Sequence, residues 1–251
     1  MIEVKNLTKR YGKQIALDHI SFKIRNRKIY GLLGHHGAGK STVLNVLAGC
    51  LAADEGTVTV NGYDICEQSM DARRQMGYLP ENPPLFPDMT PYEYLTFVAE
   101  VKGVKGELVR RQVKEAMTLT GVVPVADRMI RNLSKGYERR IGIAQALLGN
   151  PDIVLLDEPL EGLDPKQTME TRELIKRLGQ TKTVVISGHI LAEISQICDH
   201  IIMLDGGQVV ADRDVEFTDI PNQSLESVFL NTAEESLPKE ENDLYEEDSQ
   251  Q

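Results

Sequence analysis

Gly34-His35-His36-Gly37-Ala38-Gly39-Lys40-Ser41 is the stretch of this sequence that decides its fold. It matches the pattern G-x-x-x-x-G-K-[ST], in which glycines let the backbone curl so that successive N–H groups converge on a phosphate chain. Lys40 brings a compact cation to the outer phosphates, and the Ser41 hydroxyl can ligate Mg²⁺. An apolar strand over 28–33 precedes the loop, and a helix over 42–48 follows it. Since the positive end of that helix faces the anion, the stretch predicts a nucleoside triphosphate site.

The composition is that of an ordinary globular chain. Of the 251 residues, 41% are hydrophobic and 26% charged. No window approaches the roughly 18 apolar residues of a membrane span, and the N-terminus has no apolar run of the secretory kind. The three cysteines at 50, 66 and 198 form no C-x-x-C pair, which indicates free thiols in a reducing compartment. We expect a cytoplasmic protein, so any membrane role must come through a partner.

The negative charge is concentrated at the C-terminal end. The net charge is −10, and residues 233–251 hold eight acidic residues and one lysine. We expect this tail to be disordered and solvated, with a regulatory or partner-binding role as the alternative. The remaining residues 1–232 carry a net charge of only −3 and indicate no broad cationic face for nucleic acid.

The strand and helix patterns predict an α/β fold. Alternating residues over 2–4 and 15–24, and a run at 57–60 before Asn61-Gly62, predict an N-terminal antiparallel β-subdomain. Apolar strands alternate with helices in the second half. The expected strands there are 152–156, 183–186, 200–204 and 208–210, and the expected helices are 134–148, 165–178 and 191–198. That alternation is typical of a parallel sheet core.

A helical subdomain over about 82–150 is predicted as an insert in a domain spanning 1–232. Three prolines within 80–84 indicate that residues 76–87 have no regular structure. Thr90-Pro91 is typical of a helix start. The apolar face expected for that helix consists of Tyr92, Leu95, Phe97, Val98 and Val101. A second helix is expected over 107–120.

Two adjacent acids end the apolar strand at 152–156. Asp157 lies at the strand end beside the phosphate loop, where it can hold Mg²⁺. Glu158 is then placed to orient or deprotonate an attacking water molecule. With the phosphate loop, these acids predict hydrolysis of the bound triphosphate.

On these motifs the chain resembles the ATP-binding subunit of an ATP-binding cassette (ABC) transporter, over nearly all of residues 1–230. Five further motifs carry the resemblance in the family's order. They are Tyr11, Leu79-Pro80-Glu81, Leu133-Ser134-Lys135-Gly136-Tyr137, Glu161-Gly162-Leu163-Asp164 and Ser187-Gly188-His189. The resemblance implies the P-loop NTPase fold of ABC-ATPase type, with a RecA-like parallel core, the antiparallel β-subdomain and the helical subdomain.

The resemblance also implies ATP and Mg²⁺ as ligands and assigns roles to residues. It implies nucleotide contacts by Tyr11, Gly34, His35, His36, Gly37, Ala38, Gly39, Lys40, Ser41, Thr42, Ser134, Gly136 and Asp164. Metal contacts are implied for Ser41, Glu81 and Asp157, and catalytic roles for Lys40, Glu158 and His189. Two cassettes meet head to tail in the family, so Ser134 and Gly136 of one copy would close over the nucleotide of the other.

Three departures from the family pattern stand out. Glu81 replaces a glutamine; a carboxylate can still ligate Mg²⁺ but adds negative charge near the triphosphate, so we expect active hydrolysis with altered metal dependence. Lys135 and Tyr137 replace glycine and glutamine, while Ser134 and Gly136 are kept. His35-His36 replaces the usual Pro-Asn, and binding is expected to survive because the loop backbone makes most contacts.

The function implied is an ATPase subunit on the inner face of the membrane that drives a separate permease. Residues 77–84 and 133–137 are similar to those of exporter cassettes, which favours export over import. Leu85 and Phe86 are expected to contact the permease. One alternative is a soluble cassette ATPase acting on ribosomes or nucleic acid, which usually has two cassettes or coiled-coil arms. Another is a nucleotide sensor without turnover, which would normally lack Glu158. The transported substrate and the identity of the second cassette stay open.

Overall fold

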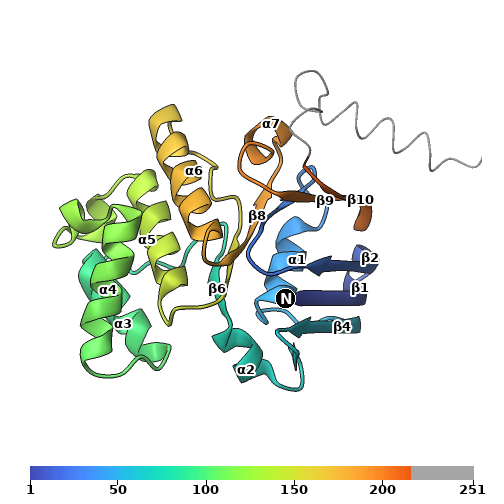
Figure 1. Ribbon diagram of the computed structural model, residues 1–251, viewed down its shortest axis with the longest axis horizontal. Helices are drawn as coiled ribbons and strands as arrows, with labels where there is room; N and C mark the ends of the chain where they lie inside the picture. The colour runs from blue at the N-terminus through green and yellow to red at the C-terminus, as the bar shows by residue number, and fades with distance from the viewer. Residues whose placement is uncertain (216–251) are drawn as a thin grey trace, which may run out of the picture.

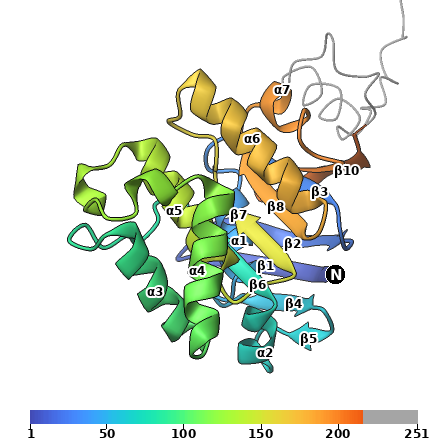
Figure 2. The ribbon, with the colours of Figure 1, turned by 60° about the vertical axis from the view of Figure 1, so that its left-hand side comes forward.

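The computed structural model describes residues 1–215, so the acidic tail predicted over 233–251 lies outside the described residues. The described chain contains two β-sheets and a separate group of helices (Figure 1). One sheet has the strand order β2-β1-β4-β5, and the other has the order β10-β9-β3-β8-β7-β6. Helices α3, α4 and α5 lie together beside these sheets in a second view (Figure 2). The predicted α/β class is confirmed.

The four-stranded sheet is antiparallel throughout. Its strands are β1 (Ile2–Tyr11), β2 (Gln14–Ile24), β4 (Glu55–Val60) and β5 (Tyr63–Asp64). The predicted Asn61-Gly62 turn joins β4 to β5, and both of its residues have positive φ, 49° and 89°. This backbone matches the twist of a hairpin, which explains the Asn-Gly sequence.

The six-stranded sheet is parallel except at one edge, where β10 runs antiparallel to β9. Its strands are β3 (Ile29–Leu33), β6 (Met76–Leu79), β7 (Ile153–Leu156), β8 (Thr183–Gly188), β9 (His200–Asp205) and β10 (Gln208–Asp214). All residues of β3, β7 and β8 are buried. Continuous apolar strands of this kind are covered by helices on both faces.

Helix α1 (Lys40–Leu47) packs between the two sheets. Its residues Val43, Leu44 and Leu47 share one apolar cluster with Val4 of the antiparallel sheet and Leu32 of the parallel sheet. On the other face of the parallel sheet lie α6 (Pro165–Gly179) and α7 (Leu191–Ile194). The helix that follows the phosphate loop is therefore held from both sides.

The prediction that residues 76–87 lack regular structure is wrong for the first four of them. Met76–Leu79 form β6, an edge strand that pairs only with β7, from Met76↔Ile153 to Leu79↔Leu156. The prolines begin one residue later, at Pro80, so none of them removes a donor from this ladder. Gly77 fits because a Cβ there would lie 1.8 Å from the Ala146 carbonyl oxygen of α5.

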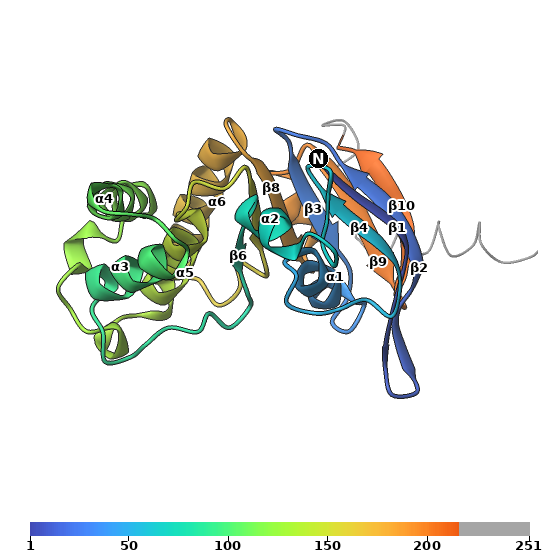
Figure 3. The same cartoon turned by 90° about the horizontal axis from the view of Figure 1, so that it is seen from below.

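The remaining helices group at one end of the molecule, opposite the antiparallel sheet (Figure 3). They are α3 (Pro91–Val101), α4 (Glu107–Thr120), the short η1 (Val123–Val125) and η2 (Ile130–Asn132), and α5 (Lys135–Leu147); α2 (Ser69–Arg74) precedes β6. Helix α5 belongs to two clusters, because Ile143 and Ala146 pack on the parallel sheet while Ile141 and Ala144 pack on α3 and α4. Within residues 1–215, no helix combines the length and hydropathy needed to cross a bilayer.

The predicted apolar face of α3 is partly wrong. Pro91, Tyr94, Leu95 and Ala99 are buried, whereas Tyr92, Phe97 and Val101 are 41%, 42% and 70% exposed. The buried set follows the i, i+3, i+4, i+8 spacing of one helix face and includes a proline and an alanine. The prediction chose large apolar residues and thereby mixed two faces.

Substitution Thr90→Ala is expected to destabilise the helical group by about 1 kcal/mol. Thr90 is the N-cap of α3: its hydroxyl accepts from the Glu93 N–H at 3.2 Å, and the Glu93 carboxylate accepts from the Thr90 N–H at 2.8 Å. Thermal unfolding followed by circular dichroism measures the effect. Thr90→Ser keeps the hydroxyl and is expected to unfold like the parent, and equal melting of all three proteins would contradict the capping role.

Candidate active site

The phosphate loop leaves the end of β3 and turns sharply into α1. Gly37 and Gly39 have φ of 85° and 105°. A Cβ on Gly39 would lie 2.7 Å from the Ala16 carbonyl oxygen and 2.8 Å from the Leu17 side chain of β2, so only glycine fits. Gly39 is also the N-cap of α1, and no side chain caps that helix. The N–H groups of its first turn are therefore available to an anion.

Lys40 is buried, and its side chain extends back to the first residues of the phosphate loop. Its side chain is 5% exposed, and Nζ donates to the carbonyl oxygens of Gly34 at 2.8 Å and His35 at 3.1 Å. The same Nζ lies 3.4 Å from Oε1 of Glu158. The loop cation and the predicted base thus form an ion pair inside the site.

The two acids after β7 are both hydrogen-bonded to Ser187, a motif residue to which the sequence analysis assigned no role. Ser187 of β8 donates its hydroxyl to Oδ1 of Asp157 at 2.6 Å and accepts the Glu158 N–H at 2.7 Å. The Ser41 hydroxyl also lies within hydrogen-bond distance of Oδ1 of Asp157, at 3.2 Å. Asp157, Glu158 and Ser187 are 1%, 7% and 1% exposed. Glu158 has a φ of 44°, a left-handed conformation that is unfavourable outside glycine and that its bond to Ser187 supports.

His189 completes this cluster from the loop after β8. Its Nδ1 lies 3.3 Å from Oε2 of Glu158, so Glu158 contacts Lys40 through one oxygen and His189 through the other. The ring of His36 lies against that of His189, with centroids 4.8 Å apart. The structure therefore brings together the three residues predicted to be catalytic and adds one loop histidine to them.

Tyr11 lies at the tip of the β1–β2 hairpin, 51% exposed, with the Lys9 ammonium 5.9 Å from the centre of its ring. The opposite strand of that hairpin contributes the Ala16 and Leu17 contacts to Gly39. An exposed aromatic face on a hairpin whose second strand contacts the phosphate loop suits a stacked base.

Ser134, Gly136 and Asp164 lie away from this phosphate loop. Ser134 is the exposed N-cap of α5, which belongs to the helical group, while α1 lies between the sheets (Figure 3). Asp164 caps α6 by accepting the Gln167 N–H at 2.8 Å. A Cβ on Gly136 would lie 2.4 Å from the Gln167 side chain, so the starts of α5 and α6 adjoin.

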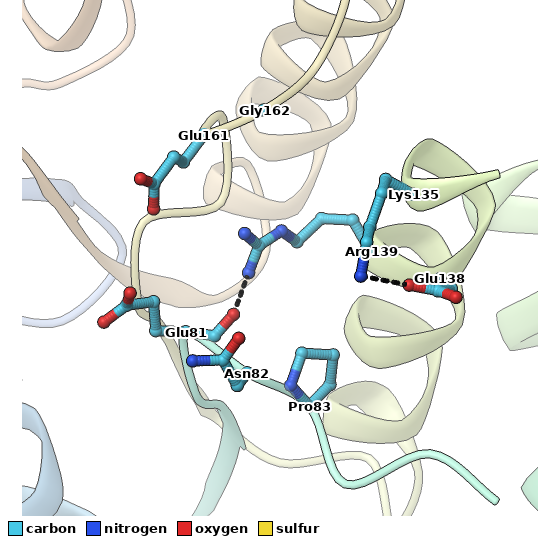
Figure 4. A pocket seen from close by; sticks show the side chains of 8 residues that line it. All are labelled: Glu81, Asn82, Pro83, Lys135, Glu138, Arg139, Glu161 and Gly162. Carbon is cyan, nitrogen blue, oxygen red and sulfur yellow. Dashed lines mark hydrogen bonds and ion pairs between the residues drawn. The ribbon is translucent and has the colours of Figure 1, made fainter. Parts of the chain in front are cut away.

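Glu81 is one of the residues that line a second pocket, which includes neither Ser41 nor Asp157 among its lining residues (Figure 4). The pocket has a volume of about 360 Å³ and is lined by Glu81, Asn82, Pro83, Lys135, Glu138, Arg139, Glu161 and Gly162. Arg139 points into it and donates to the Glu81 carbonyl oxygen at 2.7 Å. Burial lowers the pKa of Arg139, and the nearby carboxylates of Glu161 and Glu81 oppose that shift.

A chain of polar contacts runs from α5 to the phosphate-loop helix. Gln145 donates to the Tyr78 carbonyl oxygen at 2.6 Å, the Tyr78 hydroxyl donates to Asn45 at 3.3 Å, and Asn45 donates to the Ser41 carbonyl oxygen at 2.8 Å. Burial and the charge of Asp157 raise the pKa of Tyr78, so its hydroxyl stays a donor. This chain connects the helical group to the site through β6.

Substitution Ser187→Ala is expected to lower kcat for ATP hydrolysis about 10-fold or more, because it leaves the buried Asp157 oxygen and Glu158 N–H without this partner. Steady-state phosphate release measures kcat. Ser195→Ala is the matched control, since Ser195 is also buried and its hydroxyl has no hydrogen-bond partner among residues 1–215. Ser187→Thr keeps a hydroxyl and should recover much of the loss; a Ser187→Ala protein as active as Ser195→Ala would contradict the role.

Comparison with known proteins places this site in a family. Residues 17–161 match the family model described as ABC transporter. The linearmycin resistance ATP-binding protein LnrL of Bacillus subtilis is 33% identical, over 84% of this chain and 68% of its own length. The lantibiotic transport ATP-binding protein SrtF of Streptococcus pyogenes is 30% identical, over 92% of this chain and 96% of its own.

A solved structure agrees with the sequence relatives. The dimeric post-hydrolysis state of the ATP-binding cassette MJ0796, bound to ADP and Pi, is 28% identical with a TM-score of 0.77. The match covers 86% of this chain and 99% of that one. The chain therefore belongs to the ABC transporter family, as an ATP-binding cassette that hydrolyses ATP.

Proposed function

We propose that this chain hydrolyses MgATP between two cassettes and thereby drives export through a separate membrane permease. The observation that carries the proposal is the buried cluster in which Glu158 contacts Lys40 at 3.4 Å and His189 at 3.3 Å. A loop cation, a carboxylate and an imidazole meet there at the end of the phosphate loop. These are the groups needed to hold a terminal phosphate and activate water.

Each residue has a distinct task in this proposal. Lys40 and the N–H groups at the start of α1 bind the phosphate oxygens and stabilise negative charge that develops during transfer. Glu158 accepts a proton from the attacking water or orients it. His189 donates a hydrogen bond toward the terminal phosphate from the ring nitrogen that does not face Glu158. Ser187 keeps Asp157 and Glu158 in place.

The donor set fits Mg²⁺. The hydroxyl of Ser41 and Oδ1 of Asp157 are hard oxygen ligands that lie 3.2 Å apart at the end of the phosphate loop. Bound there, the ion would neutralise charge on the phosphate oxygens. A direct contact of Glu81 with the metal stays a prediction; the Glu81 carbonyl oxygen faces Arg139, and its carboxylate points away from Arg139 (Figure 4).

A second cassette would supply Ser134, Gly136 and Asp164 to this nucleotide. All three lie at the adjoining starts of α5 and α6, so they are positioned together. The similar cassette MJ0796 has been solved as a dimer. A head-to-tail arrangement would place the N-terminus of α5, whose cap residue makes no side-chain bond, against the phosphates of the other copy.

Export is supported by what the relatives are named for. LnrL is named for linearmycin resistance and SrtF for lantibiotic transport. The permease would dock on the exposed aromatic pair Phe86 and Phe97, whose rings lie 5.7 Å apart. Leu85, also expected to dock, is instead partly buried against the helical core. The cassette would thus lie on the cytoplasmic face of the membrane, and its acidic balance gives no reason to expect nucleic acid.

Substitution Glu158→Gln is expected to reduce ATP hydrolysis about 100-fold or more while ATP binding is retained, because the amide cannot accept the proton. Phosphate release and binding of a fluorescent ATP analogue measure the two effects. The surface variant Glu115→Gln is the control, since the ion pair that Glu115 makes within residues 1–215 is with Arg111 on α4. Full turnover by Glu158→Gln would exclude Glu158 as the base.

Substitution Phe97→Asp is expected to abolish co-purification of a polytopic permease from native membranes, while the ATPase activity of the isolated chain is kept. A charge at the centre of the exposed aromatic pair would disrupt an apolar interface. Met70→Asp is the control, because Met70 is 61% exposed on α2. Recovery of ribosomal or chromosomal proteins in place of a permease would instead favour a soluble cassette ATPase.

A further inference from the structure

His36 of the phosphate loop contacts His189, one of the three residues predicted to be catalytic, but has no catalytic role in the proposed mechanism. Its ring lies 4.8 Å from that of His189, centroid to centroid, with the ring planes inclined by 38°. Distances of this order are typical of attractive aromatic pairs. The two rings reach each other from different segments, the loop after β3 and the loop after β8.

Within residues 1–215, the described polar contact of the His189 ring is the one with Glu158. Its side chain is 33% exposed, and its contact with Glu158 is long, at 3.3 Å. On one side it follows Gly188, the last residue of β8, and on the other it precedes Ile190, which is 44% exposed. One long hydrogen bond fixes an edge of an imidazole but leaves the ring free to rotate about that contact. The tilted contact with the His36 ring is a second contact that restricts this rotation.

The backbone beneath His36 is rigid. The Ala38 N–H donates to the His35 carbonyl oxygen at 3.1 Å, which closes a turn around His36. Lys40 holds the carbonyl oxygens of Gly34 and His35 on the preceding side. These contacts fix the backbone from which the exposed His36 side chain reaches the ring of His189.

We propose that His36 is a positioning residue, which stacks on His189 and holds its ring in the orientation needed at the terminal phosphate. Asparagine, the residue expected at this place from the family pattern, has no aromatic face and cannot do this. This contact connects the phosphate loop to His189, the histidine proposed to contact the terminal phosphate. This inference rests on the proposed role of His189 in hydrolysis.

The first test observes the ring of His189 directly, in the full chain without nucleotide. The chain has five histidines, so the ring Cε1–H signals of protein with ¹³C-labelled histidine are few enough to assign with a His189→Asn variant. His36→Asn should move and broaden the His189 signal, because ring-current shielding is lost and the ring samples more than one orientation. His36→Phe should leave the signal sharp, because an aromatic face is kept.

The second test separates kcat from KM. His36→Asn is expected to lower kcat for ATP hydrolysis by about 2- to 10-fold with KM for ATP little changed, the range expected for loss of one aromatic pair. His36→Phe is expected to recover kcat. His19→Asn is the matched control, since His19 lies in β2, its φ of 50° suits asparagine, and the ion pairs of its ring in the described part of the chain are with Asp18 and Glu55.

The outcomes discriminate between roles. An unchanged His189 signal and unchanged kcat in His36→Asn would overturn the inference. A raised KM that His36→Phe fails to correct would also overturn it, because His36 would then bind phosphate through its ring nitrogens. Neither result affects the proposed ATPase mechanism, which is tested by Glu158→Gln. Normal turnover in His189→Asn would show that His189 is not needed for hydrolysis, and the role of His36 in positioning it would then be overturned even if NMR shows that the two rings are in contact.

Discussion

The register of three parallel strands is the constraint on which the whole site depends. Leu33 of β3 pairs with Gly188 of β8, so the phosphate loop and His189 leave the sheet at the same level. Leu156 of β7 pairs with Ile186 of β8, which places Asp157 and Glu158 beside Ser187. A shift of one residue would turn these side chains to the other face of the sheet and break every contact of the cluster.

Because the cluster is buried, each of its charged groups needs a hydrogen-bond or ion-pair partner within it. Lys40 uses two donors on loop carbonyls and meets Glu158 beyond them, and Ser187 satisfies both Asp157 and the Glu158 backbone. Unpaired groups at this depth would cost several kcal/mol. Glu158 adopts a left-handed conformation here, and its N–H donates to the Ser187 hydroxyl.

Local pattern was enough to predict what depends on local chemistry. The phosphate loop, the strand ending in Asp157 and the Asn61-Gly62 hairpin each combine a residue type with a backbone requirement that is visible over a few positions. What failed depended on neighbours distant in sequence. β6 is a strand because β7 lies beside it, and Phe97 is exposed because α4 and α5 cover the other face of α3. Ser187 could have been identified from its place two residues before His189, but the contact between His36 and His189 follows only from the pairing of Leu33 with Gly188.

Besides the apolar packing of Ile143 and Ala146 on the parallel sheet, two side chains of α5 attach the helical group to main-chain carbonyl groups at β6. Gln145 and Arg139 of α5 donate to the carbonyl oxygens of Tyr78 and Glu81, at the two ends of the short segment that leaves β6. Carbonyl acceptors are present whatever the side chain, so the replacement of the family's glutamine by Glu81 leaves this attachment intact. From Tyr78 the contacts continue through Asn45 to the Ser41 carbonyl oxygen. A rotation of the helical group must therefore either carry β6 with it or break these bonds, and β6, an edge strand paired on one side only, is the strand of the sheet most able to follow.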